Sequence, residues 1–491
     1  MTQMNEHTLH TRPRIVIVGG GFVGYTVART LGKKLLPDEA DVVLIDATGV
    51  MTYQPFLAEV AGGLVEPRHL AIPLRQVLPH ARVVTGRVTT VDRQAKTVLV
   101  TLPDGTGYLE EYDQLVMAPG AVPRTRPIPG LAERAVGFGT LADASYLRDR
   151  VLTRIALAAD TDNLPTFRRA LSFVVIGGGY SGVEAVAELQ NLATAAIKRY
   201  PNLEPRDMRW ELIEAGEEIM PELPPRLGEY TRRRLAKSGI TVRLSAQVTS
   251  LEDGMVTLSD GKQFAADTVV WTAGVRANPL LATLGVPVDA RGRLQCNPLL
   301  QVQGAPGIWS AGDGAAVPDL AAAAKVRDNG ATMPLCGATA QHAVRQAKRL
   351  ARNILAIIRS RSTGDYRHPD AGSVASLGLH RGVARIYGIP MRGIIAWLLH
   401  RCYHLMMVPT WGRKVRVAAG WGAALFGRRD LTPLPAGGWT VNLSGMPVGV
   451  EQGAESWHDS PQLLSVSRQR SATSGAAVAC ISGKPNINVE A

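Results

Sequence analysis

Apolar and polar positions near the start of the chain predict a strand, a tight turn and a helix. The apolar run Ile15–Val18 leads directly into Gly19, Gly21 and Gly24, spaced as G-x-G-x-x-G, and a helical pattern of apolar positions follows. A second apolar run, DVVLID, ends on Asp46, 22 residues beyond Gly24. Strand, glycines, helix, strand and acid in this order are the fingerprint of a dinucleotide-binding unit.

The same unit recurs in the middle of the chain. The segment LSFVVIGGGYSGVEAVAELQ places Gly177, Gly179 and Gly182 after a predicted strand, and a later strand, WELIEAG, reaches Glu214. In each unit the first glycine permits the turn, the second lets a pyrophosphate approach the backbone, and the third lets helix and strand pack closely. The helix N-terminus attracts the phosphates. Two such units predict an α/β protein with two Rossmann-like domains.

Polar residues at the strand ends indicate which nucleotide binds where. Asp46 and Glu214 are expected to accept hydrogen bonds from ribose hydroxyls. Acids and no nearby arginine follow Glu214, so the second site should repel a 2′-phosphate and prefer NADH to NADPH. Farther along, GIWSAGDGA leads to Gly312 and Asp313, where Asp313 is expected to bind the ribityl chain or pyrophosphate of FAD. Such a chain is most simply a flavoprotein that passes a hydride from a nicotinamide to FAD.

Composition excludes several classes of protein. The 491 residues are 46% hydrophobic and 20% charged, which is typical of a globular protein rather than of disorder or a fibrous repeat. Four cysteines lie far apart and form no C-x-x-C pair, which disfavours a zinc site, a disulfide scaffold and a redox dithiol. No metal site is expected. The first 14 residues contain no apolar stretch, so we predict no secretory signal and a cytoplasmic start.

The net charge of +12 is concentrated near the C-terminus. Residues 371–429 hold nine basic residues and no acid, and their second half interleaves the bases with aromatic side chains. This pattern is typical of helices that lie in a membrane interface. The side chains expected to insert are Trp397, Leu398, Leu399, Trp411, Trp421 and Phe426.

Other interpretations of this stretch are weaker. A basic, partly buried helical domain is the alternative, and no nucleic-acid partner is expected because the stretch is rich in Leu, Ile and Met. Its apolar runs are shorter than the ~20 residues that a spanning helix needs. Residues 436–491 show no sustained period and are predicted to be mostly disordered.

Several longer segments make the chain resemble a known family, the type II NADH dehydrogenases. They are YQPFLAEVAGGLVEPRHLAIPLR, YDQLVMAPGAVP, IGGGYSGVEAVAEL, ELPPRLGEY, VVWTAGVRANPLL, IWSAGD and ATAQHA. The resemblance implies an FAD domain assembled from residues 13–138 and 286–390, an inserted NADH domain at 139–285 and a membrane-associating region at 391–435. It also implies a quinone acceptor and a peripheral place on the cytoplasmic face of the cell inner membrane, and it leaves a homodimer open.

The resemblance carries two side chains over to the quinone chemistry. Glu184, expected in the first turn of the second fingerprint helix, resembles a carboxylate that passes protons near the quinone. The helix dipole alone would also favour an acid there. Gln341, predicted at the start of a helix, matches a residue of the quinone pocket. The family often has paired glutamines where this chain has Arg345 and Gln346, which leaves the identity of the quinone open.

The expected reaction passes a hydride from NADH to FAD and then two electrons to a membrane quinone, without proton pumping. A dithiol reductase is excluded because YQPFLAEVAGG has no cysteine. A sulfide:quinone oxidoreductase is disfavoured because no cysteine precedes Cys296, and Cys336 alone lies near the expected flavin site. The remaining alternative is an NADH-binding flavoprotein with a regulatory or interaction role.

Overall fold

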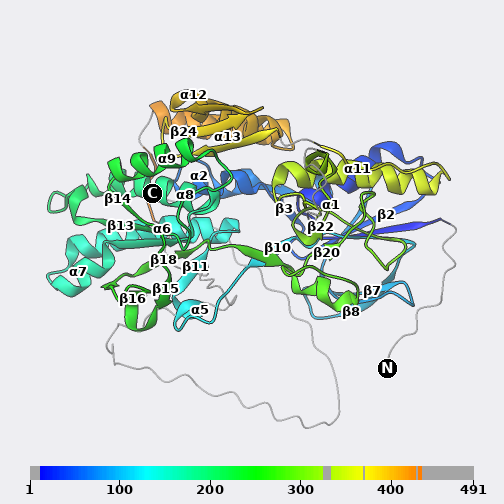
Figure 1. The fold of residues 1–491 in the computed structure, drawn as a ribbon, viewed down its shortest axis with the longest axis horizontal. Helices are drawn as coiled ribbons and strands as arrows, with labels where there is room; N and C mark the ends of the chain where they lie inside the picture. The colour runs from blue at the N-terminus through cyan, green and yellow to red at the C-terminus, as the bar shows by residue number, and fades with distance from the viewer. Residues whose placement is uncertain (1–11, 325–332, 369–370, 427–428, 434–491) are drawn as a thin grey trace, which may run out of the picture. The chain divides into compact units, whose positions relative to one another are not determined.

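The computed structural model describes residues 12–324, 333–368, 371–426 and 429–433 (Figure 1). The predicted tail at 436–491 therefore lies outside the described residues. Two five-stranded sheets dominate the fold, and all of their strands are parallel. This arrangement is the two-unit α/β architecture that the glycine fingerprints predict.

The first sheet has the strand order β21-β9-β1-β2-β5. Its strands are β1 (Arg14–Val18), β2 (Asp41–Asp46), β5 (Arg82–Thr85), β9 (Gln114–Met117) and β21 (Ile308–Ser310). The other four strands of this sheet come from residues 14–117, whereas β21 comes from residues 308–310. Two separate segments of the chain therefore build this domain. Helices α1 (Phe22–Lys34) and α11 (Ala340–Ile358) pack against each other (Figure 1).

The second sheet repeats the plan with the order β11-β18-β12-β13-β14. Its strands are β11 (Ala135–Gly137), β12 (Ser172–Ile176), β13 (Arg209–Ile213), β14 (Ile240–Arg243) and β18 (Thr268–Trp271). Its longer helices are α6 (Leu141–Asp160), α7 (Leu164–Ala170), α8 (Tyr180–Ile197) and α9 (Pro225–Lys237). Because β11 already belongs to this sheet, the expected boundary at residue 139 falls after its first strand in the chain.

Antiparallel pieces accompany both sheets. One three-stranded sheet holds β6 (Arg87–Asp92), β7 (Thr97–Thr101) and β8 (Gly107–Glu111), and the other holds β15 (Val248–Ser250), β16 (Met255–Leu258) and β17 (Gln263–Ala265). Strands β10 (Ala121–Pro123) and β19 (Val275–Ala277) pair with each other. The strand through which the chain leaves the first domain therefore lies beside the strand through which it returns, as an inserted domain requires.

The C-terminal segment folds as a small sheet with two helices. Strands β23 (Gly372–Ser376), β24 (Gly382–Ile386) and β25 (Ile389–Arg392) are antiparallel, and α12 (Ile394–Met407) packs on them. Helix α13 (Trp411–Phe426) follows. The expected boundary at residue 391 therefore falls inside β25.

Shorter elements complete the fold. They are β3 (Val50–Thr52), α2 (Leu57–Ala61), α3 (Pro67–Leu70), β4 (Ala71–Pro73), α4 (Leu74–Val77), α5 (Leu131–Arg134), β20 (Leu294–Gln295), β22 (Ala315–Ala316) and α10 (Leu320–Ala323). Strand β3 pairs with β4, and α2 packs against α6 and α8.

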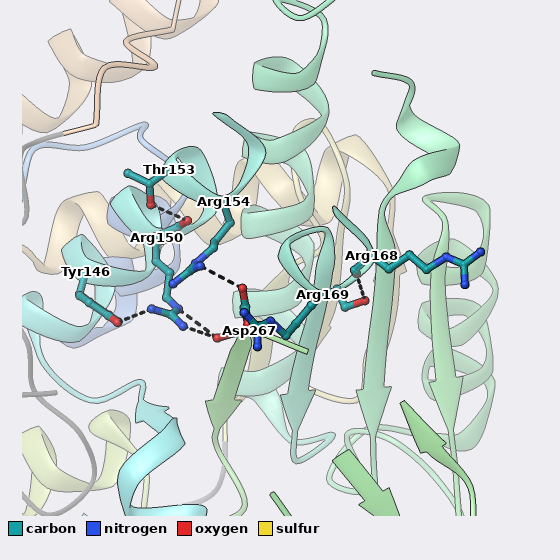
Figure 2. A network of polar contacts seen from close by, with 8 residues as sticks. Tyr146, Arg150, Thr153, Arg154, Arg168, Arg169 and Asp267 are labelled. Atoms are coloured by element: carbon teal, nitrogen blue, oxygen red, sulfur yellow. Dashed lines mark hydrogen bonds and ion pairs between the residues drawn. The ribbon is translucent and has the colours of Figure 1, made fainter. Parts of the chain in front are cut away.

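A network around Asp267 holds the helices of the second domain on their sheet (Figure 2). Its carboxylate pairs with Arg154 of α6 at 3.0 Å and with Arg169 of α7 at 2.8 Å. Nε of Arg150 donates to the Asp267 main-chain oxygen at 3.1 Å. Since Asp267 directly precedes β18, these bonds fix two helices relative to the strand that precedes the return of the chain to the first domain.

Candidate functional site

The first glycine fingerprint has the geometry that a pyrophosphate needs. Gly19 has φ +97°, and a Cβ there would lie 2.2 Å from the Ala118 oxygen, so only glycine fits. A Cβ on Gly24 would lie 1.8 Å from the Gly19 oxygen. A Cβ on Gly21, in contrast, would meet no atom within 4 Å. Gly21 therefore leaves a space open beside the backbone, whereas Gly19 and Gly24 are needed for close packing.

The second fingerprint reproduces these three environments. Gly177 has φ +112° and its Cβ would lie 2.7 Å from the Thr272 backbone, and a Cβ on Gly182 would lie 1.9 Å from the Gly177 oxygen. A Cβ on Gly179 would meet nothing within 4 Å. Helices α1 and α8 both begin without a side-chain cap. Their first N–H groups are therefore available to phosphate oxygens, and the donor set fits a dinucleotide at each unit.

The strand-end acids are tied to the fingerprints in a way that the sequence did not reveal. Oδ2 of Asp46 accepts a hydrogen bond from the Gly20 N–H at 2.8 Å, and Oε2 of Glu214 accepts one from the Gly178 N–H at 2.5 Å. Glu214 Oε1 also accepts from the Gly216 N–H at 2.7 Å. Oδ1 of Asp46 accepts three more hydrogen bonds, from the N–H and hydroxyl of Thr48 and from the Gly49 N–H. Each carboxylate thus holds its turn in place, and Glu214 retains lone pairs for a ribose.

The Gly312–Asp313 turn meets the start of α11. The Gly312 N–H donates to Oε1 of Gln346 at 2.8 Å, and the turn packs against α11. Burial raises the pKa of Asp313 above its usual value, although Arg293 opposes the shift. A half-buried carboxyl at the end of β21, the late strand of the first sheet, fits its expected place at the flavin.

Glu184 lies at a junction of three elements. It is the fifth residue of α8, so it stands in the second helical turn and the expected first-turn position is wrong. Its Oε1 accepts the Ser376 N–H of β23 at 2.8 Å and lies 3.3 Å from Nε2 of His400 in α12. Burial lowers the pKa of His400, but the hydrogen bond and charge of Glu184 and the charge of Glu59 raise it further, above the usual value. The geometry therefore favours a protonated His400 beside Glu184.

Gln341 contacts the beginning of β23, whereas Glu184 contacts its last residue, Ser376. As predicted, it stands at the start of α11, where Thr339 caps the helix. Its amide oxygen accepts the Ala371 N–H and its amide nitrogen donates to the Gly372 oxygen, both at 3.3 Å. Both candidate quinone residues thus contact β23, Gln341 at Gly372 and Glu184 at Ser376, and these two positions lie roughly 13 Å apart at about 3.3 Å per residue.

A buried cluster of charges lies next to Glu184, and sequence reasoning missed it. Glu59 of α2 and Glu188 of α8 are 1% and 0% exposed, and Arg401 of α12 lies 3.4 Å from Glu59. Burial raises the pKa of Glu59 to about 7 and also raises that of Glu188. Ser376 donates to Glu188 at 3.1 Å. These carboxyls can hold protons close to Glu184.

Two tryptophans belong to this cluster rather than to a membrane surface. The Arg401 guanidinium lies 4.3 Å from the ring centre of Trp397 and 4.6 Å from that of Trp421. Both rings are buried, so the expectation that they insert into a bilayer is wrong. The indoles cover a buried cation instead. The side chain of Phe426 lies outside what the structure describes.

Other side chains of the C-terminal helices are exposed. Helix α12 presents Ile394, Ile395, Leu398, Tyr403, Met406 and Met407, and α13 presents Trp411, which is 80% exposed, and Val415. Leu399 is half-buried. Helices α12 and α13 have 14 and 16 residues. No helix within the described ranges is long and apolar enough to cross a membrane.

Among the cysteines that the structure describes, Cys296 and Cys336 are buried and Cys402 is exposed. Burial raises the pKa of Cys296 to about 12 and that of Cys336 to about 11, so both thiols stay protonated. A protonated thiol is a poor nucleophile. Cys336 therefore does not offer the reactive sulfur that a polysulfide-carrying enzyme requires.

The chain matches a family over most of this architecture. Residues 13–328, more than half of the chain, match the pyridine nucleotide-disulphide oxidoreductases, and the chain belongs to that family. Within it, the chain belongs to the type II NADH:quinone oxidoreductases. It is 30% identical over 433 residues to Ndh of Mycobacterium tuberculosis, which covers 85% of this chain and 89% of that protein.

A further relative and a solved structure are also similar to this chain. Demethylphylloquinone reductase NdbB of Synechocystis is 32% identical over 418 residues, covering 84% of this chain and 96% of that protein. Among solved structures, NDH2 from Plasmodium falciparum in complex with NADH has a TM-score of 0.78 at 18% identity, covering 86% of this chain and 99% of that one. The last comparison shows a shared fold.

Proposed function

We propose that this protein is an FAD-dependent NADH:quinone oxidoreductase that uses its two fingerprints for two different dinucleotides. FAD occupies the first unit, held by Gly19, Gly21, Gly24, Asp46, Gly312 and Asp313. NADH occupies the inserted unit, held by Gly177, Gly179, Gly182 and Glu214. One observation carries the proposal: beside Gly21 and beside Gly179 there is open space where a Cβ would meet no atom within 4 Å. Each of these glycines stands at the N-terminus of a helix that has no side-chain cap.

The chemistry of the cofactor defines what the protein must supply. FAD, when bound, accepts two electrons from NADH and releases them to a second substrate. The protein positions the two nucleotides through its helix N-termini and fixes both phosphate turns through Asp46 and Glu214. The short β10–β19 pair joins the two domains that hold them.

The quinone receives protons from the side chains that meet at β23, where Glu184 of α8 contacts His400 of α12. Reduction of a quinone consumes two protons, and Glu184 with a protonated His400 3.3 Å away can hold and deliver one. Gln341 orients the head group through an amide that β23 holds in place. Burial raises the pKa of Glu59 and of Glu188, so these two carboxyls can hold further protons behind Glu184.

The function is tested by the stoichiometry of the reaction. Under anaerobic conditions, we expect one water-soluble short-chain quinone to be reduced for each NADH oxidised, and protein stripped of FAD should be inactive until FAD is restored. NADH oxidation that proceeds with oxygen but not with any quinone would contradict the proposal. It would favour the alternative of an NADH-binding flavoprotein with a regulatory role.

Cofactor preference provides a specific prediction. The negative charge of Glu214 should repel the 2′-phosphate of NADPH, so we expect kcat/KM to be at least about tenfold higher for NADH. Glu214→Gln should shrink this ratio, whereas Glu252→Gln, an equal loss of charge at an exposed site of the same domain, should leave it unchanged. Steady-state kinetics with both nucleotides measures the ratio. Equal use of NADPH by the wild type would refute the assignment.

The pH dependence of the quinone step should report His400. Its pKa is raised, so it stays protonated above pH 6.5 and loses its proton as the pH rises through the higher value. Reoxidation of the flavin by quinone should therefore slow on the alkaline side. His400→Gln should be slower at pH 6 and should lack this alkaline decline. A wild-type rate that increases with pH would show that His400 does not supply the proton.

Membrane contact is proposed for residues 391–429. The exposed apolar side chains of α12 and α13 and the exposed base Arg416 suit an interfacial position, as a peripheral protein on the cytoplasmic face of the inner membrane requires. The buried pairing of Arg401 with Glu59 fixes α12 to the catalytic domains. A homodimer stays a prediction, and so do the domain limits.

A further inference from the structure

A basic groove lies between α1 and α11, outside both dinucleotide fingerprints. It has a volume of about 400 Å³ and is also lined by Met407, the last residue of α12, and by Pro409. Five basic residues line it: Arg29, Lys33 and Lys34 from α1, and Lys348 and Arg352 from α11. No acidic residue lines the groove, and no ion pair joins these five side chains to a carboxylate within the described ranges.

Helical spacing explains why the charges converge. On α1, Thr26, Thr30 and Lys33 follow one another at intervals of four and three residues, and on α11, Val344, Lys348 and Arg352 follow at intervals of four. Such spacings place side chains on one face of a helix. Because the two helices pack together, the two basic faces border one space. Five cations without counter-charges within the described ranges suit an anionic group.

The other end of the groove is apolar. Phe22, Met51, Met407 and Pro409 line it. Met407 is 42% exposed and is also one of the side chains through which α12 is proposed to meet the membrane. A ligand that fills the groove is therefore anionic at one end and apolar at the end that adjoins the proposed membrane face.

We infer that this groove binds the phosphate head group of an anionic phospholipid, whose acyl chains leave over Met407. The inference rests on the proposed membrane contact of residues 391–429. A soluble anion would use the bases but leave the apolar end uncovered, and a neutral quinone has no charge for five cations to bind. The bound lipid would anchor the FAD domain itself on the bilayer, next to the α11 helix that carries Gln341.

Vesicle binding with a charge-matched pair of variants tests this site. The groove variant carries Lys33→Gln, Lys348→Gln and Arg352→Gln, and the control carries Arg124→Gln, Arg126→Gln and Arg226→Gln at exposed positions elsewhere. Each base near an anionic surface contributes ~1 kcal/mol, so the groove variant should bind phosphatidylcholine vesicles that contain phosphatidylglycerol about a hundredfold more weakly. The control should bind like the wild type, and all three should oxidise NADH equally with a water-soluble quinone.

The outcomes distinguish failure of the groove site from failure of the proposed membrane contact of residues 391–429. Failure of the wild type to bind these vesicles would overturn the membrane contact and the groove site together. Equal binding by the groove variant and the wild type would overturn the groove site alone. Inorganic phosphate is then added to vesicle-bound wild type, with sodium chloride of equal ionic strength as reference. Release by phosphate alone would show a free-phosphate site, and equal release by both salts supports the lipid.

Discussion

Gly21→Val should purify without FAD, and Gly179→Val should keep its FAD but lose its reduction by NADH. Both glycines have extended backbone conformations that valine adopts, with φ −67° and −72°, and a Cβ on either meets nothing within 4 Å. The fold should therefore tolerate both substitutions. The added side chain would occupy the space where a pyrophosphate must approach the backbone N–H groups.

The expected effect is large because charged hydrogen bonds are lost. Each bond to a charged group contributes about 1.5 to 3 kcal/mol, so losing even one weakens binding by at least about tenfold. The flavin absorbance of the purified protein measures FAD content, and bleaching by NADH measures the second site. The two variants serve as controls for each other, since the substitution is the same. If Gly21→Val kept its full flavin content while Gly179→Val lost it, the two assignments would have to be exchanged.

Glu184→Gln should separate the two halves of the reaction. Glutamine keeps an oxygen for the Ser376 N–H but cannot deliver a proton. General acid catalysis typically contributes 10² to 10⁴ in rate, so reoxidation of the flavin by quinone should slow by about a hundredfold or more. Bleaching by NADH should stay near the wild-type rate, because the NADH site does not use this carboxylate.

Stopped-flow absorbance measures both steps on the same sample. Glu222→Gln is a suitable control, since it removes an acid from an exposed site of the same domain. Gln341→Ala should also slow reoxidation, though less, because it removes an orienting contact rather than a proton donor. Slow bleaching with normal reoxidation in Glu184→Gln would move this residue to the NADH side.

The sequence predicted those parts of the site that local patterns encode. A fingerprint packs its glycines, helix and strand within some 30 residues, so Gly19, Gly21 and Gly24 and their counterparts could be placed with their packing roles. The late strand at Ile308–Ser310 could be assigned to the first sheet only through the resemblance. Its pairing with β9 joins residues almost 200 positions apart.

The buried charges around Glu184 could not be predicted in this way. Glu59, Glu188 and Arg401 come from three helices that are distant in the sequence, and each alone looks like an ordinary surface charge. The same limitation explains the error at Trp397 and Trp421. Basic and aromatic residues at helical spacing describe both an interfacial helix and a helix that buries an arginine between indoles. Only the position of Glu59 decides between them.

Truncation of the C-terminal region would be a poor test of the proposed membrane contact. A chain that ends near Pro390 would remove the partner of Glu59 and leave a buried carboxyl without its cation. Such a truncation would confuse loss of membrane contact with loss of stability. Polar substitutions at Ile394, Ile395, Leu398 and Trp411 test the exposed face and leave the buried cluster intact.

The order of electron transfer tests the central claim most directly. In an anaerobic double-mixing experiment, the oxidised wild-type protein first meets one equivalent of NADH and then a quinone. We predict full bleaching of the flavin in the first step, before any quinone is present, and full recovery of its absorbance in the second with one quinone reduced. A flavin that bleaches only when quinone is already present, or that quinone cannot reoxidise, would contradict the account.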